Sequence, residues 1–409
     1  MISLKKIKFG IILIFIPGIF TAFYPGKIVV ISFICLIPIL FYLSNKILNF
    51  KINEEFDNKG VINFYFIFSI ITYVRGIFDI NSEQDFIVLF SNTTFTLLLY
   101  PLFIYLAKFK YSLRVLNALV SIALPLSFVT LFLKPHDMFY DFQHNMSFIY
   151  IFVFFIPFIE IKWKLIILLI CVFIPFYDLS RRSPLINSAV PLIILFIYYI
   201  FPISVFRNLS KIGFFLLITT PVIFLVLGLF GSFNIFNIGE SFNEINITKS
   251  SNQRNMLVDS RSAIYQDVFS ELSRQNSIIY GLGGNGKTRT SLIYDDQGSF
   301  DKIYKEGRRA TESAMLNQFQ YGGIIAAFAY WLLLSVASYN AIFKSNSGIM
   351  LMIGLFVAFK VLFSFIEDQL QPNAATFYMM FIIGLCYNNK LRSLKDFHIK
   401  TLSKFIFKY

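Results

Sequence analysis

Residues 311–343 read TESAMLNQFQYGGIIAAFAYWLLLSVASYNAIF, a polar beginning that runs directly into a long apolar stretch. No Asp, Glu, Lys or Arg occurs in residues 314–343. This stretch is longer than the roughly 20 residues that an α-helix needs to cross the hydrocarbon core of a bilayer. It therefore predicts a membrane-spanning helix that begins where a polar segment of the chain ends.

The composition extends this prediction to the whole chain. Its 409 residues have a mean hydropathy of +0.67, and 56% of them are hydrophobic while only 14% are charged. A soluble protein of this length has no use for so much apolar surface. We therefore predict an all-α integral membrane protein.

Apolar runs along the chain predict about twelve membrane-spanning helices. The runs cover residues 9–24, 27–43, 61–78, 86–107, 113–133, 146–160, 163–177, 184–203, 211–231, 314–343, 348–366 and 372–388. The short runs 146–160 and 163–177 form either two spans or one re-entrant hairpin. The predicted organisation is nine helices in 1–231, one large extracytoplasmic loop at 232–313 between helices 9 and 10, three helices in 314–388, and a basic cytoplasmic tail at 389–409.

The positive charges orient these spans. With the N-terminus inside, the short inside segments hold 20 Lys and Arg residues, whereas the short outside segments hold only Lys27, Lys134, Arg181 and Arg182. Cytoplasmic loops of membrane proteins carry such an excess. Both termini are therefore predicted to be cytoplasmic, and the tail is predicted to lie on the inner leaflet as an amphipathic segment.

The excess of Lys and Arg in the cytoplasmic segments also explains the net charge of +13. We therefore expect no nucleic acid as a partner. Cys35, Cys171 and Cys386 all lie inside apolar runs, and the three His residues do not cluster. This pattern predicts neither a disulfide nor a metal site.

Residues 281–288 read GLGGNGKT and match the nucleotide-binding pattern G-x-x-x-x-G-K-[ST]. A P-loop also needs a strand before it and an apolar helix after it, but the residues that follow, RTSLIYDDQG, make a poor helix. We therefore favour a flexible or tightly turning Gly-rich segment over an ATP site, and its backbone N–H groups stay available as expected donors to a phosphate.

Two segments place arginines where anions are expected. Residues 259–276, DSRSAIYQDVFSELSRQN, predict an amphipathic helix with Arg261 in its first turn. A cation is unfavourable there, so Arg261 has either an anionic partner or an ordinary solvated position. Arg181 and Arg182 lie at the outer end of a span, where they either snorkel to lipid headgroups or clamp a phosphate.

Charged residues at or inside the predicted spans add further candidates. Arg75 lies near the outer end of one span, and Lys360 lies inside another, near the carboxylates that follow it. Glu312 opens the helix at 314, where it either favours the helix N-terminus electrostatically or accepts a proton from a hydroxyl. Other outer carboxylates compete for the second role: Glu83, Asp85, Asp178, Glu367 and Asp368.

Three segments together resemble the bacterial O-antigen polymerase and ligase superfamily, the Wzy-type membrane glycosyltransferases. They are LSRRSPLI at an outer boundary, SRSAIYQDVF through YGLGGNG in the loop, and TESAMLNQFQYGGI where the chain re-enters the membrane. The predicted plan of spans with one large outer loop is also similar. The ligase branch usually has His at the position of Glu312, so the Glu favours the polymerase branch.

The resemblance implies a polymerase in a bacterial plasma (inner) membrane that joins oligosaccharide repeats carried on undecaprenyl pyrophosphate. It implies Glu312 as the base or orienting acceptor and Arg261 as a catalytic cation. The pyrophosphate would be bound by Arg181 or Arg182, with Arg75 and Arg254 behind them. Arginines stabilise a leaving pyrophosphate without a metal, and no cofactor is implied. The resemblance also allows a chain-length regulator as a partner.

Three alternatives stay open. A ligase would transfer finished glycan to lipid A core or to a protein, and only the acceptor separates it from a polymerase. A flippase or transporter for lipid-linked sugars usually has repeated halves and short loops, which the sequence does not show. A P-loop ATPase is the third.

Overall fold

The computed structural model describes residues 55–125, 128, 146–177, 182–229, 261–289, 307–371 and 374–407. Within these residues the fold is all-helical, apart from two isolated β-bridges that join Phe56 to Asn388 and Thr288 to Arg308. The predicted all-α class is confirmed for this part of the chain.

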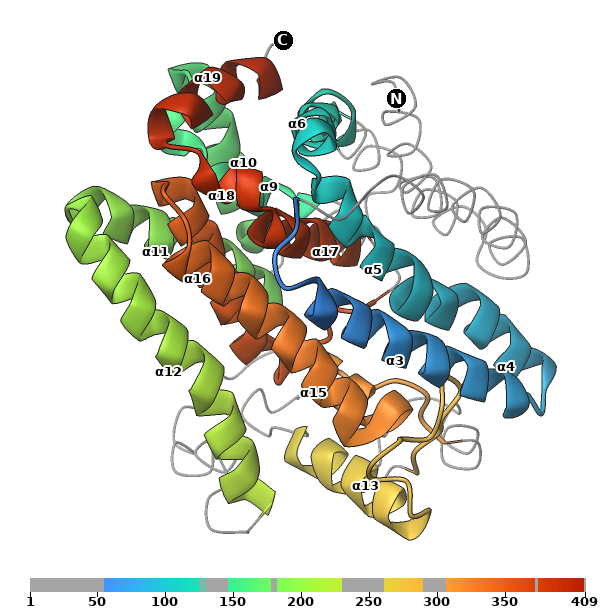
Figure 1. Cartoon of the computed structure of the whole chain (residues 1–409). Coiled ribbons are helices and arrows are strands. Elements are labelled where there is room, and N and C mark those ends of the chain that lie inside the picture. Colours follow the sequence, from blue (N-terminus) through green and yellow to red (C-terminus); the bar gives the residue numbers. More distant parts are fainter. Residues whose placement is uncertain are drawn as a thin grey trace, which may run out of the picture.

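The helices follow one another in the order seen in Figure 1. They are α3 (Lys59–Phe78), α4 (Glu83–Val88), η2 (Leu89–Leu99), α5 (Tyr100–Leu102), η3 (Phe103–Ala107), α6 (Phe109–Ala118), η4 (Leu119–Ala123), α9 (Ile149–Val153), η5 (Ile156–Phe158), α10 (Ile161–Tyr177), α11 (Arg182–Ile200), α12 (Ile203–Leu229), α13 (Arg261–Arg274), α15 (Ala314–Phe343), α16 (Gly348–Ser364), α17 (Ala374–Tyr387), α18 (Asn389–Ser393) and α19 (Asp396–Ile406).

Four described helices are long and apolar enough to cross a membrane: Lys59–Phe78, Ser183–Ile200, Ile203–Leu227 and Ala314–Phe343. Two shorter apolar helices cover Gly348–Ser364 and Ala375–Tyr387. This composition is that of a membrane protein. The predicted spans 9–24 and 27–43, the end of 113–133 and most of the loop 232–313 lie outside the described residues. Residues 146–160 form only the short helices α9 and η5.

Helix α15 is the central element of the described bundle, and it packs against α3, α12, α13, α16 and α17. Its side chains Tyr330, Leu333 and Leu334 are fully buried. Helices α10, α11 and α12 instead expose large apolar side chains, such as Leu169, Phe196 and Leu216. Such contiguous apolar exposure is expected of helices that face lipid.

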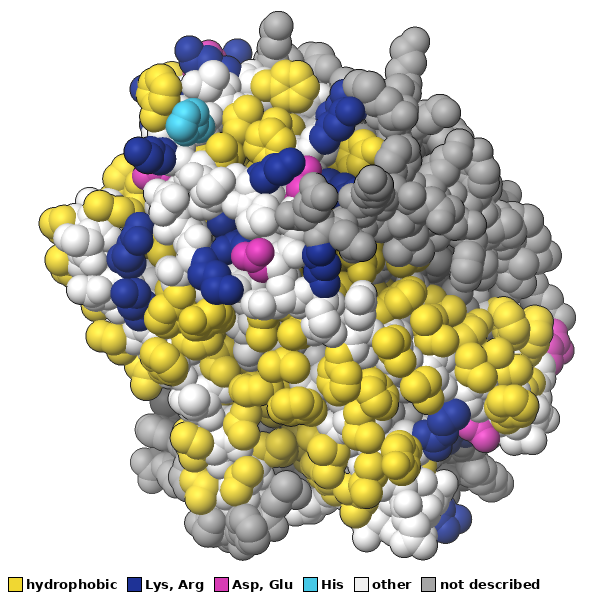
Figure 2. Space-filling model, in the orientation of Figure 1, with side chains coloured by type: hydrophobic (Ala, Val, Ile, Leu, Met, Phe, Trp, Pro, Cys, Tyr) yellow, Lys and Arg dark blue, Asp and Glu magenta, His cyan; other side chains and the backbone are white. Residues whose placement is uncertain are grey.

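The end of the bundle that carries α19 is rich in Lys and Arg. Figure 2 shows a broad band of hydrophobic side chains across one face, with a group of Lys and Arg side chains between this band and the end that carries α19. At that end Lys390 pairs with Glu55 at 2.9 Å, and the buried Arg392 pairs with Asp57. Helix α19 buries Ile399 and Ile406 and exposes Phe397 and Phe405, so the predicted amphipathic tail is an amphipathic helix.

At its opposite end α15 is interrupted. Gly323 has a φ of 68°, which breaks the helix after its third turn. The Gly-rich segment lies along the break: Leu282 N donates to Gln320 O at 2.7 Å, and Ile324 N donates to Ile278 O at 2.9 Å. The loop thereby supplies partners for backbone groups that the interrupted helix cannot pair within itself.

Candidate functional site

The Gly-rich segment 281–288 is held by protein groups on several sides. The backbone N–H groups of Leu282, Gly283 and Gly284 donate to carbonyl oxygens of α15 and α3 at 2.7, 2.8 and 3.0 Å. A P-loop needs its backbone N–H groups free to cradle phosphate. Because these donors are already used, the segment does not have the geometry of a nucleotide site, and the interpretation as a tightly turning segment is confirmed.

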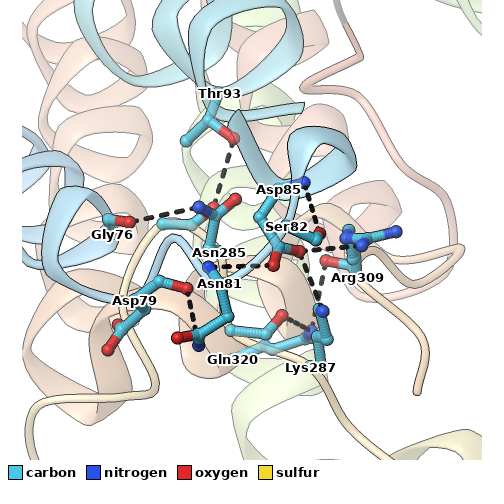
Figure 3. A network of polar contacts seen from close by, with 12 residues as sticks. Gly76, Asp79, Asn81, Ser82, Asp85, Thr93, Asn285, Lys287, Arg309 and Gln320 are labelled. Carbon is cyan, nitrogen blue, oxygen red and sulfur yellow. Dashed lines mark hydrogen bonds and ion pairs between the residues drawn. The ribbon is translucent and has the colours of Figure 1, made fainter. Parts of the chain in front are cut away.

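The motif's lysine is used in the same way (Figure 3). Lys287 Nζ and Arg309 Nη2 each lie 2.8 Å from Asp85 Oδ1, and Asp85 is fully buried. Burial alone raises the pKa of the Asp85 carboxyl. The hydrogen bonds from Lys287 and Arg309 outweigh this, so the pKa lies well below its usual range. The carboxylate therefore stays charged. It joins α4 to the two segments of the loop that carry Lys287 and Arg309.

Neutral side chains complete this arrangement, which we call the loop clamp: residues 280–289 and 307–309 with their partners on α3, α4, η2 and α15. Gln320, fully buried on α15, donates its amide N–H groups to Gly286 O at 2.8 Å and to the carbonyls of Arg308 and Arg309 at 3.1 Å. Asn285 Nδ2 donates to Gly76 O, and Thr93 Oγ1 donates to Gly284 O (Figure 3). The loop clamp is thus held by side-chain bonds from Gln320, Asn285 and Thr93.

Arg75 belongs to the loop clamp as well. Its guanidinium donates to Tyr280 O and, at 3.0 Å, to Gly281 O. The cation that the resemblance assigned to pyrophosphate therefore lies against two loop carbonyls.

A second polar region lies where α15 begins. We call it the α15 entrance and define it as residues 311–317 together with 364–370 after α16. Ser313 caps α15, its hydroxyl accepting from Leu316 N at 3.2 Å and donating to Ser364 O at 3.0 Å. Ala314 N donates to Glu367 O at 3.1 Å. These bonds hold the start of one helix against the end of another.

Helix α13 joins the α15 entrance through Tyr265. The Tyr265 hydroxyl donates to Phe365 O at 2.7 Å and lies 3.2 Å from Ser313 Oγ. Arg261 is the first residue of α13, one helical turn before Tyr265. The backbone at Arg261 is therefore brought to the same end of the bundle as Ser313.

Helix α11 reaches the neighbouring end of α16 through Asn187. Lys360 Nζ donates to Asn187 Oδ1 at 2.6 Å and lies within 5.9 Å of the ring centres of Phe356, Phe359 and Phe363. Glu367 adds an electrostatic attraction. Arg182 is the first residue of α11, so its backbone lies at this end of the helix pair.

At the α15 entrance the side-chain amide of Asn317 donates to the carboxylate of Asp368. Asn317 Oδ1 accepts from Thr311 N at 2.6 Å and from Thr311 Oγ1 at 2.8 Å, and Asn317 Nδ2 donates to Thr311 O at 3.2 Å. The amide is thus fixed in one orientation, and Nδ2 also serves Asp368. Asp368 accepts from Leu370 N at 2.9 Å as well.

The predicted site residues fall in different places. Glu312 is exposed between the buried Thr311 and Ser313. Arg261 and Arg182 begin α13 and α11, and Arg75 lies in the loop clamp. Arg181 and Arg254 lie outside the described residues. Asn187, Tyr265 and Asn317 were not predicted as site residues. The signal that could have found them is a polar side chain in apolar surroundings: Asn187 and Asn317 lie in apolar helices, and Tyr265 lies beside the apolar face of an amphipathic helix.

No protein-family model, curated protein or solved structure matches this chain. The functional argument therefore rests on the sequence motifs and on the geometry of the two polar regions.

Proposed function

We propose that this protein is a polysaccharide polymerase of the bacterial plasma membrane. It joins oligosaccharide repeats carried on undecaprenyl pyrophosphate, without a metal, at the extracytoplasmic end of its helix bundle. A hydroxyl of the acceptor repeat attacks the anomeric carbon of the donor repeat, and undecaprenyl pyrophosphate leaves.

The observation that carries this proposal is the convergence of the three resembling segments. The described part of the first segment, residues 182–186, begins α11, which is tied to α16 by Lys360 and Asn187. The segment that begins at Arg261 is tied to the α15 entrance by Tyr265. The segment 311–324 forms the α15 entrance and the interrupted first turns of α15. Through these contacts Asn187, Tyr265 and Ser313 all lie at the end of the bundle where α16 ends and α15 begins.

The chemistry needed for glycosyl transfer is available at this end. A leaving pyrophosphate gains negative charge, which arginine side chains stabilise. Arg261 and Arg182 begin two of the converging helices. The acceptor hydroxyl needs a carboxylate to take its proton, and Glu312 and Asp368 both belong to the α15 entrance.

The charge distribution supports the direction of the bundle in the membrane. The end that carries α18 and α19 presents the exposed Lys390, Lys395, Lys400 and Lys404. Cytoplasmic ends of membrane proteins carry such lysines. The α15 entrance lies at the other end of α15 and is then extracytoplasmic, as is expected for a site that polymerises exported lipid-linked repeats.

The proposal is tested by the surface polysaccharide of cells. The gene is deleted and restored as wild type or Arg261→Ala, protein levels in the membrane are matched, and the polysaccharide is separated on a gel. A polymerase predicts that deletion leaves a single repeat and that wild type restores the ladder. Polymer that accumulates on the carrier lipid but does not reach its final acceptor would instead indicate a ligase. Unchanged polysaccharide in every strain would contradict both.

A further inference from the structure

We propose that Asp368, rather than Glu312, is the general base that takes the proton from the acceptor hydroxyl. This inference rests on the proposed function and assigns its proton-accepting group. It is drawn from the position of Asp368 among the helices that converge at the α15 entrance.

The geometry gives Asp368 a fixed but incomplete set of partners. Leu370 N and the Asn317 amide donate to its carboxylate, and the Asn317 amide is itself locked by Thr311. A carboxylate has about four lone-pair positions, so two donors leave room for a substrate hydroxyl. Asp368 is partly buried, which combines access with protection from bulk water. A base needs this combination of orientation and access.

Glu312 lacks this support. Its side chain is exposed, whereas its neighbours Thr311 and Ser313 are buried and hold the turn in place. An exposed Glu side chain rotates about three bonds, and orienting it costs conformational entropy in every reaction cycle. Its acidic character suits the N-terminus of α15 electrostatically, which accounts for the residue without a catalytic role.

The charges around Asp368 suit a base that works near neutral pH. Burial raises the pKa of the Asp368 carboxyl to about 6; the bonds from Leu370 and Asn317 act against this rise, and the neighbouring Glu367 adds to it. From α15, Tyr321 and Tyr330 lie close enough to interact electrostatically with Asp368, and from α16 Lys360 attracts Glu367. Asp368 is therefore mostly ionised at pH 7 and still holds a transferred proton readily.

The step balances without a co-reactant. The acceptor oxygen forms a bond to the anomeric carbon while the bond from that carbon to the pyrophosphate oxygen breaks. The electron pair leaves with undecaprenyl pyrophosphate, and the hydroxyl proton passes to an oxygen of Asp368. Release of this proton to water restores the carboxylate for the next cycle.

The experiment uses the full chain in membrane vesicles, with lipid-linked repeats extracted from the deletion strain as the probe. Wild type, Asp368→Asn, Asp368→Glu, Glu312→Gln and Glu367→Gln are compared at equal folded protein, and polymer formation is measured from pH 4.5 to 8. We expect Asp368→Asn to lose at least about 100-fold of the rate, and Asp368→Glu to regain part of it.

The pH profiles give a reading that a merely structural role would not produce. A base works when it is deprotonated, so the wild-type rate should rise with pH through the pKa of Asp368. Glu367→Gln removes a negative charge that raises this pKa, so its rise should move to lower pH. Asp368→Asn should lose this acid limb at whatever rate remains.

The outcomes separate this inference from the proposed function. If wild type makes no polymer from the extracted repeats, the proposed function fails. If wild type polymerises and Asp368→Asn keeps more than a tenth of the rate with the acid limb intact, the inference about Asp368 fails. A loss confined to Glu312→Gln would return the role to that residue.

Discussion

The loop clamp and the α15 entrance are both polar regions beside apolar helices, yet they use their polar groups differently. In the loop clamp Asp85 is fully buried and shared by two cations, and the loop carbonyls are held by Gln320 and Arg75. At the α15 entrance Asp368 has two neutral donors, and Glu312 is exposed. A buried carboxylate that two cations share holds a structure, whereas a carboxylate with two neutral donors is able to accept a further hydrogen bond from a substrate.

The largest effect on stability is expected from a substitution of Asp85 in the loop clamp. Asp85→Asn leaves Lys287 and Arg309 without their shared anion, and breaking one member of a buried pair costs about 3–5 kcal/mol. We expect a large fall in the thermal midpoint of the purified protein in detergent. Glu83→Gln, an exposed carboxylate on the same helix, is the control and should change the midpoint little. Equal midpoints for both variants would contradict a structural role for the loop clamp.

The ion pairs of Asp85 with Lys287 and Arg309 also make the stability depend on pH. The folded-state pKa of Asp85 lies below that of an unfolded aspartate, so its contribution is complete above about pH 4. This contribution is lost as pH falls below that value and the carboxyl takes up a proton. The thermal midpoint of wild type should therefore fall on acidification below pH 4 more steeply than that of Asp85→Asn. Parallel curves would show that the pair contributes little.

The proposed role of the α15 entrance is tested by comparing two arginines of α13. Arg261 begins the helix at the α15 entrance, whereas Arg274 ends it and pairs with Glu271. Removing one group that stabilises developing charge typically costs about 10²–10³ in rate. We expect Arg261→Ala to lose polymer formation on this scale, with Arg274→Ala within a few-fold of wild type. Similar rates in the two variants would remove the anion-binding role from Arg261.

A smaller effect is expected where the loop crosses the interruption of α15. Gly323 has a positive φ and faces the backbone of residue 279, so Gly323→Ala should destabilise by at least about 1–3 kcal/mol. Gly60 in α3 has open space around it, and Gly60→Ala should be neutral or stabilising by about 0.5–1 kcal/mol. Thermal midpoints of the two variants in detergent test this contrast, and a shift of the same sign in both would contradict it.

The smallest effect is expected at the end of the bundle that carries α18 and α19. Lys390 pairs with Glu55 at 2.9 Å, but the lysine side chain is 59% exposed. Exposed pairs contribute about 0–1 kcal/mol and are screened by salt. Lys390→Gln should therefore lower the thermal midpoint only slightly, and less in 0.5 M NaCl than at low salt. A loss as large as that of Asp85→Asn would show that this end also acts as a clamp.

The sequence predicted the helical class and several helix positions because apolar runs and turn signals are local. Ser313, which caps α15, is one such local signal, because a Ser directly before an apolar helix is a favoured N-cap residue. The sequence also predicted a turning segment at 281–288. It did not predict which residues this segment contacts, because those residues lie on α3, η2 and α15, far away in the sequence. For the same reason Asn317 and Tyr265 were missed: their roles depend on α13, α15 and α16 meeting at one point.

The most direct test of the central claim is reconstitution. The purified full chain is placed in liposomes with lipid-linked repeats extracted from the deletion strain, and the product is separated by length. The account predicts a ladder of polymers on the carrier lipid together with release of undecaprenyl pyrophosphate, and no requirement for added metal or ATP. Repeats that cross the bilayer but stay single would contradict a polymerase and indicate a transporter.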